Sequence, residues 1–466
     1  MTRPESSPPP LILTVAADAR LEGGPAPLAA AIRQQLTIDN PQYVDARKYG
    51  RWIGKRLKPQ LFFFAEEGNA LRFPRGFANQ AVRFCQQYAG TMPRIVDRRT
   101  ERPPVPLAFG GTLRPYQEEA VAAVLRRDFG VVEAGTGSGK TVIALAVIAN
   151  RRQPTLILVH TKELLYQWAE RIREFLGCEA GLLGDGHNEI RPVTVAIVNS
   201  ARRQLAELPG RFGQICVDEC HRVPASLFTE VVKVFDCRYS LGLSATAFRR
   251  DGLTRLIYYY LGDRVHQVDR EELQSAGAIL RPEFIQRPTE FTYFYRGNYQ
   301  ELMTALARNE MRNRLIAADI AAEVRQGAGT VLVVSDRVAH CERLAALLKE
   351  EEGIAAAVLT GQTPAEERSR CVAAIRGGEL AVLISTVQLI GEGFDCPGLN
   401  TLFLTTPIKF TGRVLQVVGR ILRPAAGKQP KVFDYVDPVR VLRGSAQARL
   451  RLFEEKPEGG SLWQER

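Results

Sequence analysis

The stretch Val131-Val132-Glu133-Ala134-Gly135-Thr136-Gly137-Ser138-Gly139-Lys140-Thr141 decides the fold of this chain. An apolar run ends there, a loop with three glycines follows, and residues 142–149 continue as an apolar run that suits a helix. This order is typical of a strand, a phosphate-binding loop and the first turns of a helix. Glycine allows the backbone to curl around an anion, so we expect the N–H groups of Gly135, Gly137 and Gly139 to face nucleotide phosphates.

Two side chains at the end of this loop carry chemistry. Lys140 is placed to reach the β- and γ-phosphates, and Thr141 is placed to hold a Mg²⁺ ion. The first position of the usual pattern is Ala134 in place of glycine. A glycine-rich loop of chance origin is the alternative, and the strand before the loop and the helix after it argue against that alternative. We therefore predict a site for ATP and Mg²⁺.

Short apolar runs alternate with helical patterns in two separate parts of the chain. Runs of this length between helices are typical of buried parallel strands in an α/β fold. The first part contains Val131-Val132, Leu156–Val159, Val193–Val198 and Ile215–Val217, and the second contains Val331–Val334, Ala356–Leu359, Ala381–Ser385 and Leu402–Thr405. Between the two parts, Arg281–Asn298 is rich in aromatic residues and proline and is expected to be irregular. The predicted fold class is α/β, with two α/β domains in series.

The chain is basic, and the excess of positive charge is uneven. Its 466 residues carry a net charge of +11, and residues 1–110 contribute +7 of it, because they hold 16 Lys or Arg and 9 Asp or Glu. Positive surface attracts polyanions, and nucleic acid is the commonest large one. The alternative is a modest excess that only keeps the protein soluble.

The cysteines and the hydropathy indicate a reducing compartment. The eight cysteines form no Cys-x-x-Cys pair. In the group of cysteines that lie closest together in the sequence, Cys216 belongs to an apolar strand, and this argues against a zinc site. No apolar run approaches the ~20 residues that span a bilayer. Residues 1–10 are rich in Pro and Ser and lack the apolar core of a signal peptide. We expect a cytoplasmic protein with no membrane partner.

A pair of acidic residues follows the strand-like run Gln214–Val217. A carboxylate at the tip of a buried strand, beside a phosphate loop, suits a Mg²⁺ ligand, and we assign this role to Asp218. The next carboxylate, Glu219, can orient and deprotonate the attacking water. A solvated acidic pair on the surface is the alternative, and the apolar strand before the pair argues against it.

Two further elements complete the predicted hydrolysis site. Arg114 and Gln117 precede the glycine loop, and the Gln117 amide can bond both donor and acceptor edges of adenine. Far downstream, Arg420 and Arg423 are three residues apart and share one face of a helix. A guanidinium from a second domain can neutralise charge on the γ-phosphate, which contributes about 10³–10⁵ in rate in NTPases. A solvated basic helix face is the alternative.

Together these motifs resemble superfamily 2 helicases and translocases. Seven blocks stand in the order of that family over about residues 112–440: Leu113–Gln117, Ala134–Thr141, Val159–Glu163, Asp218–His221, Leu243–Thr246, Gly391–Asp395 and Gln416–Arg423. The resemblance implies two tandem RecA-like domains with parallel sheets, with ATP in the cleft and single-stranded nucleic acid across the top. It implies that Ser244, Thr246 and Gln416 couple the two sites. It also implies that Gly393 and Asp395 contribute to ATP binding.

Within this family the chain is most similar to the XPB/UvsW branch, which acts on DNA. The likeness is carried by Val159–Leu164, Glu272–Gly277 and Ala247–Asp251. In the last block XPB has an Arg-Glu-Asp triplet, and here Arg250 reverses the middle charge. The resemblance implies movement in the 3′→5′ direction.

The N-terminal residues resemble the front domain of bacterial and phage members of that branch. That domain is taken as an accessory module for DNA binding or damage recognition, and here it is expected to be a small α+β domain. Lys48, Arg51 and Lys55 interleave with aromatic residues such as Trp52. Cations can hold phosphates while aromatic rings stack on bases. The alternative is that the aromatic residues fill a small core and the cations are solvated.

Contacts with a nucleic-acid strand are expected at the ends of several β-strands. Small polar side chains and backbone N–H groups grip phosphates without reading bases, so little sequence preference is expected. The predicted contact residues are His160, Thr161, Lys162, Asn199, Ser200, Thr360, Gly361 and Thr386.

The predicted division of the chain has five parts. Residues 1–110 form the accessory domain, 111–280 the first RecA-like domain, 281–310 an interdomain segment, 311–440 the second RecA-like domain and 441–466 a basic tail. The breaker-rich stretch before Gly111 marks the first boundary.

The leading hypothesis is an ATP-dependent DNA helicase or translocase that acts on branched or damaged DNA in repair, recombination or defence. One alternative is a translocating subunit that drives a partner nuclease without separating strands. Another is a clamp whose affinity for nucleic acid is controlled by nucleotide. RNA in place of DNA stays open, because phosphate contacts barely distinguish the two sugars.

Overall fold

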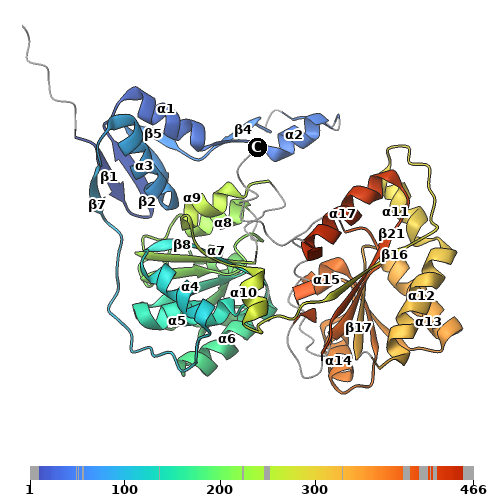
Figure 1. Ribbon diagram of the computed structural model, residues 1–466. Coiled ribbons are helices and arrows are strands. Elements are labelled where there is room, and N and C mark those ends of the chain that lie inside the picture. Colours follow the sequence, from blue (N-terminus) through green and yellow to red (C-terminus); the bar gives the residue numbers. More distant parts are fainter. Residues whose placement is uncertain are drawn as a thin grey trace, which may run out of the picture. The chain divides into compact units, whose positions relative to one another are not determined.

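The computed structural model in Figure 1 divides into two compact units. One unit contains Met1–Ala134 and Gly139–Asp269, and the other contains Gly135–Ser138 and Arg270–Arg466. The structure describes residues 10–48, 50, 52–54, 57–135, 137–222, 225–245, 252–327, 329–391, 399–408, 418–419, 421–422 and 428–454. Within these ranges, no helix is both long enough and apolar enough to cross a membrane.

An eight-stranded sheet forms the centre of the first unit. Its order is β11-β10-β12-β9-β13-β14-β8-β15, and all neighbours are parallel except β10 and β11. The strands are β8 Phe129–Ala134, β9 Thr155–Val159, β10 Gly181–Gly184, β11 His187–Asn188, β12 Val193–Ile197, β13 Gln214–Val217, β14 Tyr239–Ser244 and β15 Arg264–Val268. The four apolar runs predicted in this part are β8, β9, β12 and β13, so their assignment as buried parallel strands is confirmed.

Helices cover both faces of this sheet, which is why its central strands are continuously apolar instead of alternating. On one face lie α4 Pro115–Leu125, α5 Lys140–Arg151 and α6 Lys162–Leu176, and on the other lie α7 Val198–Arg203, α8 Ala225–Val232 and α9 Arg255–Leu261 (Figure 1). The α5 helix is buried along almost its whole length from Ile143 to Ala149, so the glycine loop before it is held on a rigid support.

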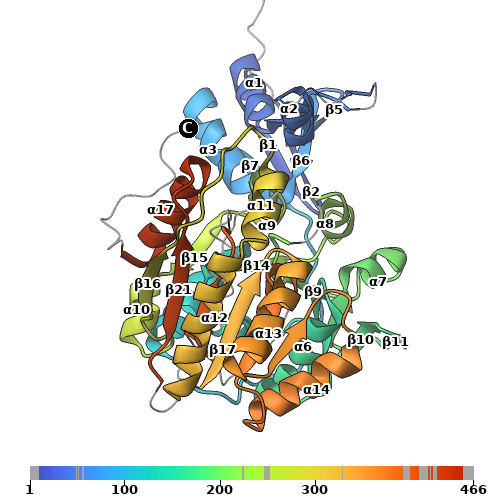
Figure 2. The ribbon, with the colours of Figure 1, turned by 90° about the vertical axis from the view of Figure 1, so that its right-hand side faces the viewer.

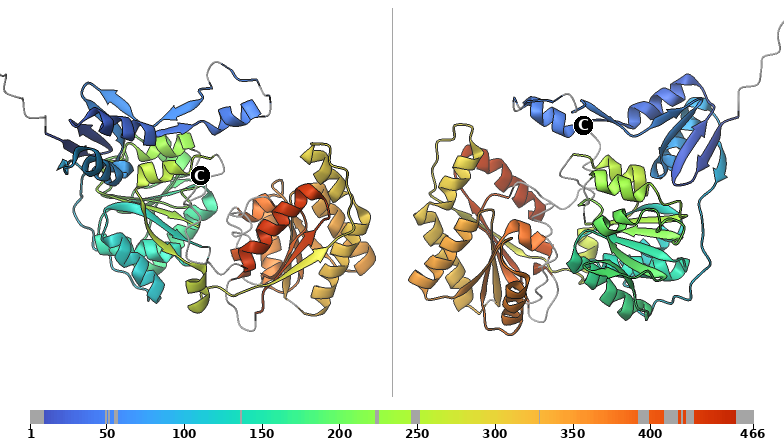
Figure 3. Two further views of the ribbon diagram at one scale, coloured as in Figure 1. Left: turned by 45° about the horizontal axis from the view of Figure 1, so that its top comes forward. Right: turned by 180° about the vertical axis from the view of Figure 1, so that it is seen from behind.

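The same unit contains a smaller five-stranded sheet with the order β5-β6-β2-β1-β7. Its strands are β1 Ile12–Val15, β2 Asp18–Glu22, β5 Ala65–Glu67, β6 Ala70–Pro74 and β7 Arg94–Asp97, and it packs with α1 Ala26–Gln35 and α3 Ala78–Ala89. The paired strands β3 Thr37–Asp39 and β4 Gln60–Phe62, with α2 Pro41–Lys48, extend from it as an arm (Figure 3). This front domain has the expected mixture of helices and strands.

The front domain shares a hydrophobic core with the first α/β domain. Phe129 and Tyr259 of the α/β domain are buried in one cluster with Phe73 and Phe77 of the front domain. The Tyr259 hydroxyl donates a hydrogen bond to the carbonyl of Gln35. Buried apolar contacts of this kind hold the two sheets together as one body.

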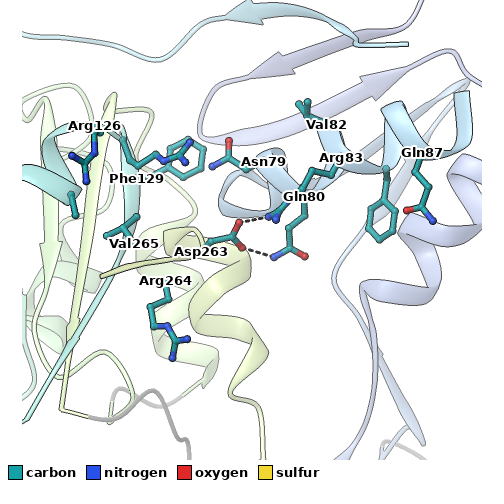
Figure 4. A pocket seen from close by; sticks show the side chains of 13 residues that line it. Asn79, Gln80, Val82, Arg83, Gln87, Arg126, Phe129, Asp263, Arg264 and Val265 are labelled. Atoms are coloured by element: carbon teal, nitrogen blue, oxygen red, sulfur yellow. Dashed lines mark hydrogen bonds and ion pairs between the residues drawn. The ribbon is translucent and has the colours of Figure 1, made fainter. Parts of the chain in front are cut away.

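Polar contacts reinforce the same junction. Arg75 is 2% exposed and donates to the Cys237 carbonyl at 2.6 Å. At a groove of about 940 Å³, Asp263 accepts hydrogen bonds from Gln80 at 2.6 Å and Arg83 at 2.5 Å (Figure 4). The front domain therefore moves with the first α/β domain.

A six-stranded parallel sheet forms the second unit, with the order β16-β21-β20-β17-β19-β18. Its strands are β16 Glu283–Pro288, β17 Thr330–Ser335, β18 Ala356–Leu359, β19 Val382–Thr386, β20 Leu399–Leu404 and β21 Lys431–Val436. The four runs predicted in this part are confirmed as β17 to β20. The prediction that Arg281–Asn298 is irregular was wrong for residues 283–288, because β21 supplies a paired neighbour that local composition does not reveal.

Helices of the second unit include α12 Glu310–Arg325 and α13 Val338–Glu352, which pack side by side on one face of the sheet (Figure 2). The described part of this unit also contains α10 Arg270–Ser275, α11 Tyr299–Ala307, α14 Ala365–Arg376, α15 Val387–Gly391 and α17 Arg440–Glu454. The basic C-terminal segment therefore includes a helix, and that helix packs on its own unit. Arg449 donates to buried Asp434 at 2.8 Å, and the Phe453 ring stacks on Phe284. The five-part division of the chain stays a prediction.

A buried histidine gives the second unit a pH dependence. His340 is 1% exposed, with Nδ1 2.9 Å from Ser335 Oγ and Nε2 2.9 Å from Asn313 Oδ1. Burial, together with the nearby Arg312 guanidinium, lowers the pKa of His340 from 6.5 to about 3. His340 therefore becomes protonated near pH 6.5 in the unfolded chain but stays neutral at that pH in the folded chain.

We expect His340 to make the protein less stable as pH falls below 6.5. The free energy of unfolding should drop by up to about 1.4 kcal/mol per pH unit from this one group. Denaturant unfolding at pH 7.5, 6.5 and 5.5 measures the loss. In His340→Gln, the loss of stability between pH 6.5 and 5.5 should be smaller by about 1 kcal/mol. Equal slopes in wild type and His340→Gln would contradict the prediction.

Candidate functional site

The glycine loop joins β8 to α5, as the sequence predicts. Gly137 and Gly139 have φ of +93° and +77°, in the left-handed region that other residues rarely adopt. A Cβ at Gly139 would lie 2.4 Å from Gln117 Nε2, so only glycine leaves room for that amide. Gln117 is 6% exposed, and its Oε1 accepts a hydrogen bond from the Arg114 N–H at 2.9 Å. The structure thus places Gln117 and Arg114 beside the loop.

Lys140 is the first residue of α5 and stands beside the acidic pair. Its Nζ donates to the Ala134 carbonyl at 3.1 Å and lies 3.7 Å from Glu219 Oε1. Thr141 follows it in the first turn of α5 and is partly exposed. The hydrogen bond to the Ala134 carbonyl keeps the Lys140 side chain over the glycine loop. A phosphate bound in the loop would replace the carbonyl as the acceptor of this hydrogen bond.

Asp218 comes directly after β13 and is held in place by an aromatic donor. It is 5% exposed, its Oδ2 accepts from Trp168 Nε1 at 2.8 Å, and its Oδ1 accepts from the Glu219 N–H at 2.9 Å. Burial, and then the neighbouring Glu219 carboxylate, raise the pKa of Asp218. Trp168 lies in α6 and was missed by the sequence analysis, because nothing local links it to a residue so far along the chain.

Glu219 follows Asp218 and lies beside Lys140 and His221. Its φ of +46° is left-handed, and its Oε2 lies 3.3 Å from His221 Nδ1. Burial alone would raise the pKa of Glu219, but Lys140 and His221 outweigh burial and lower it. Burial lowers the pKa of His221 to about 4, so at neutral pH Glu219 is ionised and His221 is neutral.

Ser244 ends β14 and reaches the same cluster. Its Oγ lies 2.9 Å from His221 Nδ1. Ser244, a predicted coupling residue, therefore contacts His221, which in turn lies beside Glu219. Thr246, the other predicted coupling residue of this block, lies outside the described residues.

The donor set here suits a hard cation such as Mg²⁺. Mg²⁺ prefers oxygen ligands and is usually bound by one or two carboxylates together with substrate phosphates and water. Asp218 and Thr141 supply such oxygens, and Glu219 Oε2 is buried and receives no hydrogen bond from any described residue. Among the described residues, no cluster of three or more His, Cys, Asp or Glu forms a cage for a metal. A small number of protein oxygen ligands is typical of a site in which Mg²⁺ is bound mainly by the phosphates of a nucleotide.

Five predicted site residues of the second unit have roles that rest on the sequence alone. Gly393, Asp395, Gln416, Arg420 and Arg423 all lie outside the described residues.

The predicted nucleic-acid contacts of the first unit lie at one edge of its sheet. His160 and Thr161 follow β9, and Asn199 and Ser200 begin just after the neighbouring strand β12. Thr161 caps α6, because its Oγ1 accepts from the Leu164 N–H at 3.3 Å. Lys162 and Asn199 are exposed at this edge. The carboxyl ends of adjacent parallel strands thus gather these residues.

The second unit has a groove of about 660 Å³ at the corresponding strand ends. Predicted contacts Gly361 and Thr386 line it, whereas Thr360 is 8% exposed and is used in the turn that follows β18. Arg337 and Arg368 also line the groove and were missed by the sequence analysis. Arg337 is the second residue after β17, so the strand-end rule that selected Thr360 would have found it.

Comparisons with known proteins agree with this geometry. The family "Type III restriction enzyme, res subunit" matches residues 111–249, and the family "Helicase conserved C-terminal domain" matches residues 309–425. Together these matches cover more than half of the chain. The chain belongs to the superfamily 2 helicases and translocases. It is an ATP-dependent enzyme of that superfamily.

The relatives of this helicase place it in the XPB/UvsW-like branch, as the sequence resemblance indicated. The "DNA 3′-5′ translocase XPB2" of Sulfurisphaera tokodaii is 27% identical over 347 residues, which cover 67% of this chain and 78% of that protein. The "DNA 3′-5′ helicase XPB" of Kineococcus radiotolerans is 29% identical over 335 residues, or 68% of this chain and 58% of that protein.

Solved structures show the fold of the helicase. A fragment of a putative HsdR subunit of a type I restriction enzyme from Vibrio vulnificus has a TM-score of 0.57 at 19% identity, covering 75% of this chain and 67% of that one. Dbp5 of Saccharomyces cerevisiae, bound to RNA and ADP BeF3, has a TM-score of 0.54 at 15% identity, covering 73% and 88%. The two α/β domains are tandem RecA-like domains.

The front domain of the helicase presents part of the predicted basic and aromatic stretch on its arm. Trp52 is 90% exposed, and its ring lies over Gly54, where a Cβ would come within 2.8 Å of it. Lys48, the last residue of α2, is also exposed. Trp52 is therefore not part of a small core. Arg51 and Lys55 lie outside the described residues.

Proposed function

We propose that this protein hydrolyses ATP to move 3′→5′ along one strand of DNA. The observation that carries the proposal is the buried group of Lys140, Asp218 and Glu219, where β8 and β13 end. Support for DNA and for this direction comes from the XPB relatives, whose names describe a DNA 3′-5′ translocase and a DNA 3′-5′ helicase.

Each residue of the group has a distinct proposed role. Lys140 and the glycine loop bind the β- and γ-phosphates. Asp218 and Thr141 hold Mg²⁺, which when bound draws charge from the phosphate oxygens. Glu219, ionised beside Lys140, orients the attacking water and accepts its proton. Arg114 and Gln117 position the adenine.

The second RecA-like domain completes the site in this proposal. Arg420 and Arg423 neutralise charge that develops on the γ-phosphate. Gly393 and Asp395 contribute to ATP binding, and Gln416 acts with Ser244 and Thr246 to couple hydrolysis to the nucleic acid. Loss of the γ-phosphate would remove these interactions and allow the two domains to separate, which is the basis of stepwise movement.

The nucleic-acid strand is proposed to contact both domains through its phosphates. The first domain supplies His160, Thr161, Lys162, Asn199 and Ser200, and the second supplies Thr360, Gly361 and Thr386 together with Arg337 and Arg368. The front-domain residues Lys48, Arg51, Trp52 and Lys55 add contacts that move with the first domain. Phosphate contacts dominate this set, so binding should depend steeply on salt and little on sequence.

The groove arginines offer a direct test of this strand path. We expect Arg337→Ala combined with Arg368→Ala to weaken binding of single-stranded DNA about equally for different sequences. The slope of log affinity against log salt should fall by about 0.7 for each phosphate that the protein no longer neutralises. Fluorescence anisotropy across a salt series measures both effects. Arg343→Ala, which removes an exposed arginine paired with Glu310 on the same unit, is the matched control. An unchanged slope in the double variant would contradict the path.

The match to the restriction-enzyme family favours a second candidate, a translocase that drives a partner nuclease without separating strands. The helicase and the translocase are distinguished by whether a strand is released. ATPase rates are compared with single-stranded DNA, duplex, fork, Holliday junction and RNA, and release of a labelled strand from the fork is followed in parallel. Strand release supports the helicase, and duplex-stimulated turnover without release supports the translocase. Turnover that no nucleic acid stimulates would contradict both. A role in repair, recombination or defence, on branched or damaged DNA, would follow from the preferred substrate.

A further inference from the structure

Tyr166 and His187 form an aromatic pair with no assigned role. The pair lies near the edge of the first domain where the nucleic-acid strand is proposed to bind. Tyr166 is in α6, one turn after Lys162, and the two share a face of that helix. Tyr166 is 42% exposed, and its ring meets the His187 ring edge to face, with centroids 6.1 Å apart and planes at 82°. The buried side of α6 is formed by other residues, including Leu165 and Trp168, so Tyr166 is not part of the core.

The turn between β10 and β11 holds the pair in position. The Tyr166 hydroxyl donates to Asp185 Oδ2 at 2.8 Å and lies 3.3 Å from His187 Nε2. Asp185 has φ of +49° and stands between two glycines with positive φ. The hydrogen bond to Asp185 raises the pKa of the Tyr166 phenol. The carboxylate thus occupies the polar end of the ring and leaves its aromatic surface for another partner.

The turn is also anchored to the second group of predicted phosphate contacts. A Cβ at Gly184 would come within 2.8 Å of Ile197, the last residue of β12, so the turn packs tightly on the strand that leads to Asn199. Gln204, just after α7, donates to Asn188 Oδ1 at 2.7 Å. The turn that carries His187 is therefore tied to residues at both ends of α7, Ile197 and Gln204.

We infer that Tyr166, held by its edge-to-face contact with His187, forms a stacking platform for an unpaired base of the strand whose phosphates bind at Lys162 and Asn199. Aromatic side chains beside phosphate contacts are the usual partners of single-stranded bases, and stacking tolerates every base because each has a π-face. This inference rests on the proposed function. It adds a contact with bases to a path that otherwise touches only the backbone.

The test compares Tyr166→Leu with Tyr166→Phe on two probes. One probe is a fluorescent single-stranded oligothymidylate, and the other has the same length but consecutive abasic sites. Tyr166→Leu should bind the oligothymidylate about 5- to 100-fold more weakly than wild type, as expected for the loss of one stacked base. It should bind the abasic probe as wild type does. Tyr166→Phe keeps the ring and should bind both probes normally, and the salt slope should be the same in all three proteins.

Each remaining outcome counts against a definite claim. Equal losses on both probes would show that Tyr166 only positions the turn, and no loss on either probe would show that it contacts nothing. Both results overturn the platform while the proposed function stands, provided that wild type binds DNA. A wild-type protein that binds neither probe would overturn the proposed function as well. A photocrosslink from 5-iodouracil DNA to Tyr166 or His187 is the expected direct confirmation, and a crosslink elsewhere on the first domain would oppose it.

Discussion

Glu219→Gln is expected to bind ATP normally and to hydrolyse it about 10²–10⁴-fold more slowly. The substitution keeps the size of the side chain and its position after β13 but removes the negative charge beside Lys140. A neutral amide cannot accept the proton of the attacking water. The rate of phosphate release with saturating single-stranded DNA measures turnover, and a fluorescent ATP analogue measures binding.

Two further variants separate a catalytic effect from general damage. Glu174→Gln changes an exposed carboxylate on α6 that pairs with Arg171, and its turnover should match wild type. Lys140→Ala should lose affinity for nucleotide as well as turnover, because its ammonium is proposed to bind the phosphates directly. Turnover within a few-fold of wild type in Glu219→Gln would falsify the role assigned to this carboxylate.

Asp437→Asn is expected to lower the free energy of unfolding of the second domain by about 3–5 kcal/mol. Arg312 and Asp437 form a fully buried ion pair at 2.8 Å, with side chains 1% and 0% exposed. Arg312 also donates to the Thr405 carbonyl, and Thr289 donates to Asp437, so α12 is joined to the ends of β16, β20 and β21. The substitution leaves the Arg312 charge buried without its partner. Hydrogen exchange of the β20 and β21 amides measures the loss in that domain.

A variant without either charge tests whether the loss of stability in Asp437→Asn comes from the unpaired charge of Arg312. Arg312→Met combined with Asp437→Leu should recover most of the stability, since no uncompensated charge then remains. The exposed pair Arg343–Glu310 is the matched comparison, and Glu310→Gln should cost at most about 1 kcal/mol. A double variant that is less stable than Asp437→Asn would contradict this explanation.

The sequence predicts well wherever neighbouring residues contain the signal. The glycine loop, the apolar strands and the carboxylates after β13 are local patterns, and the parallel strands then gather their carboxyl ends at one edge. The irregular segment predicted at 281–298 shows where this reasoning stops. Residues 283–288 form β16 because β21 pairs with them, and that partner lies far along the chain. Likewise, no local pattern predicts the roles of Trp168 and Arg368, because these roles depend on contacts between segments that are distant in the chain.

The sequence by itself determined the α/β class, the superfamily and the position of the glycine loop between β8 and α5, because backbone periodicity and glycine conformations depend on adjacent residues. Only the tertiary structure decided that Trp168 holds Asp218, that His221 links Glu219 to Ser244, and that the front domain shares a core with the first RecA-like domain. These contacts form between segments that are distant in the chain, and their geometry follows from how helices and sheets pack. A linear pattern carries the types of residue that a site needs, whereas packing sets the distances at which they act.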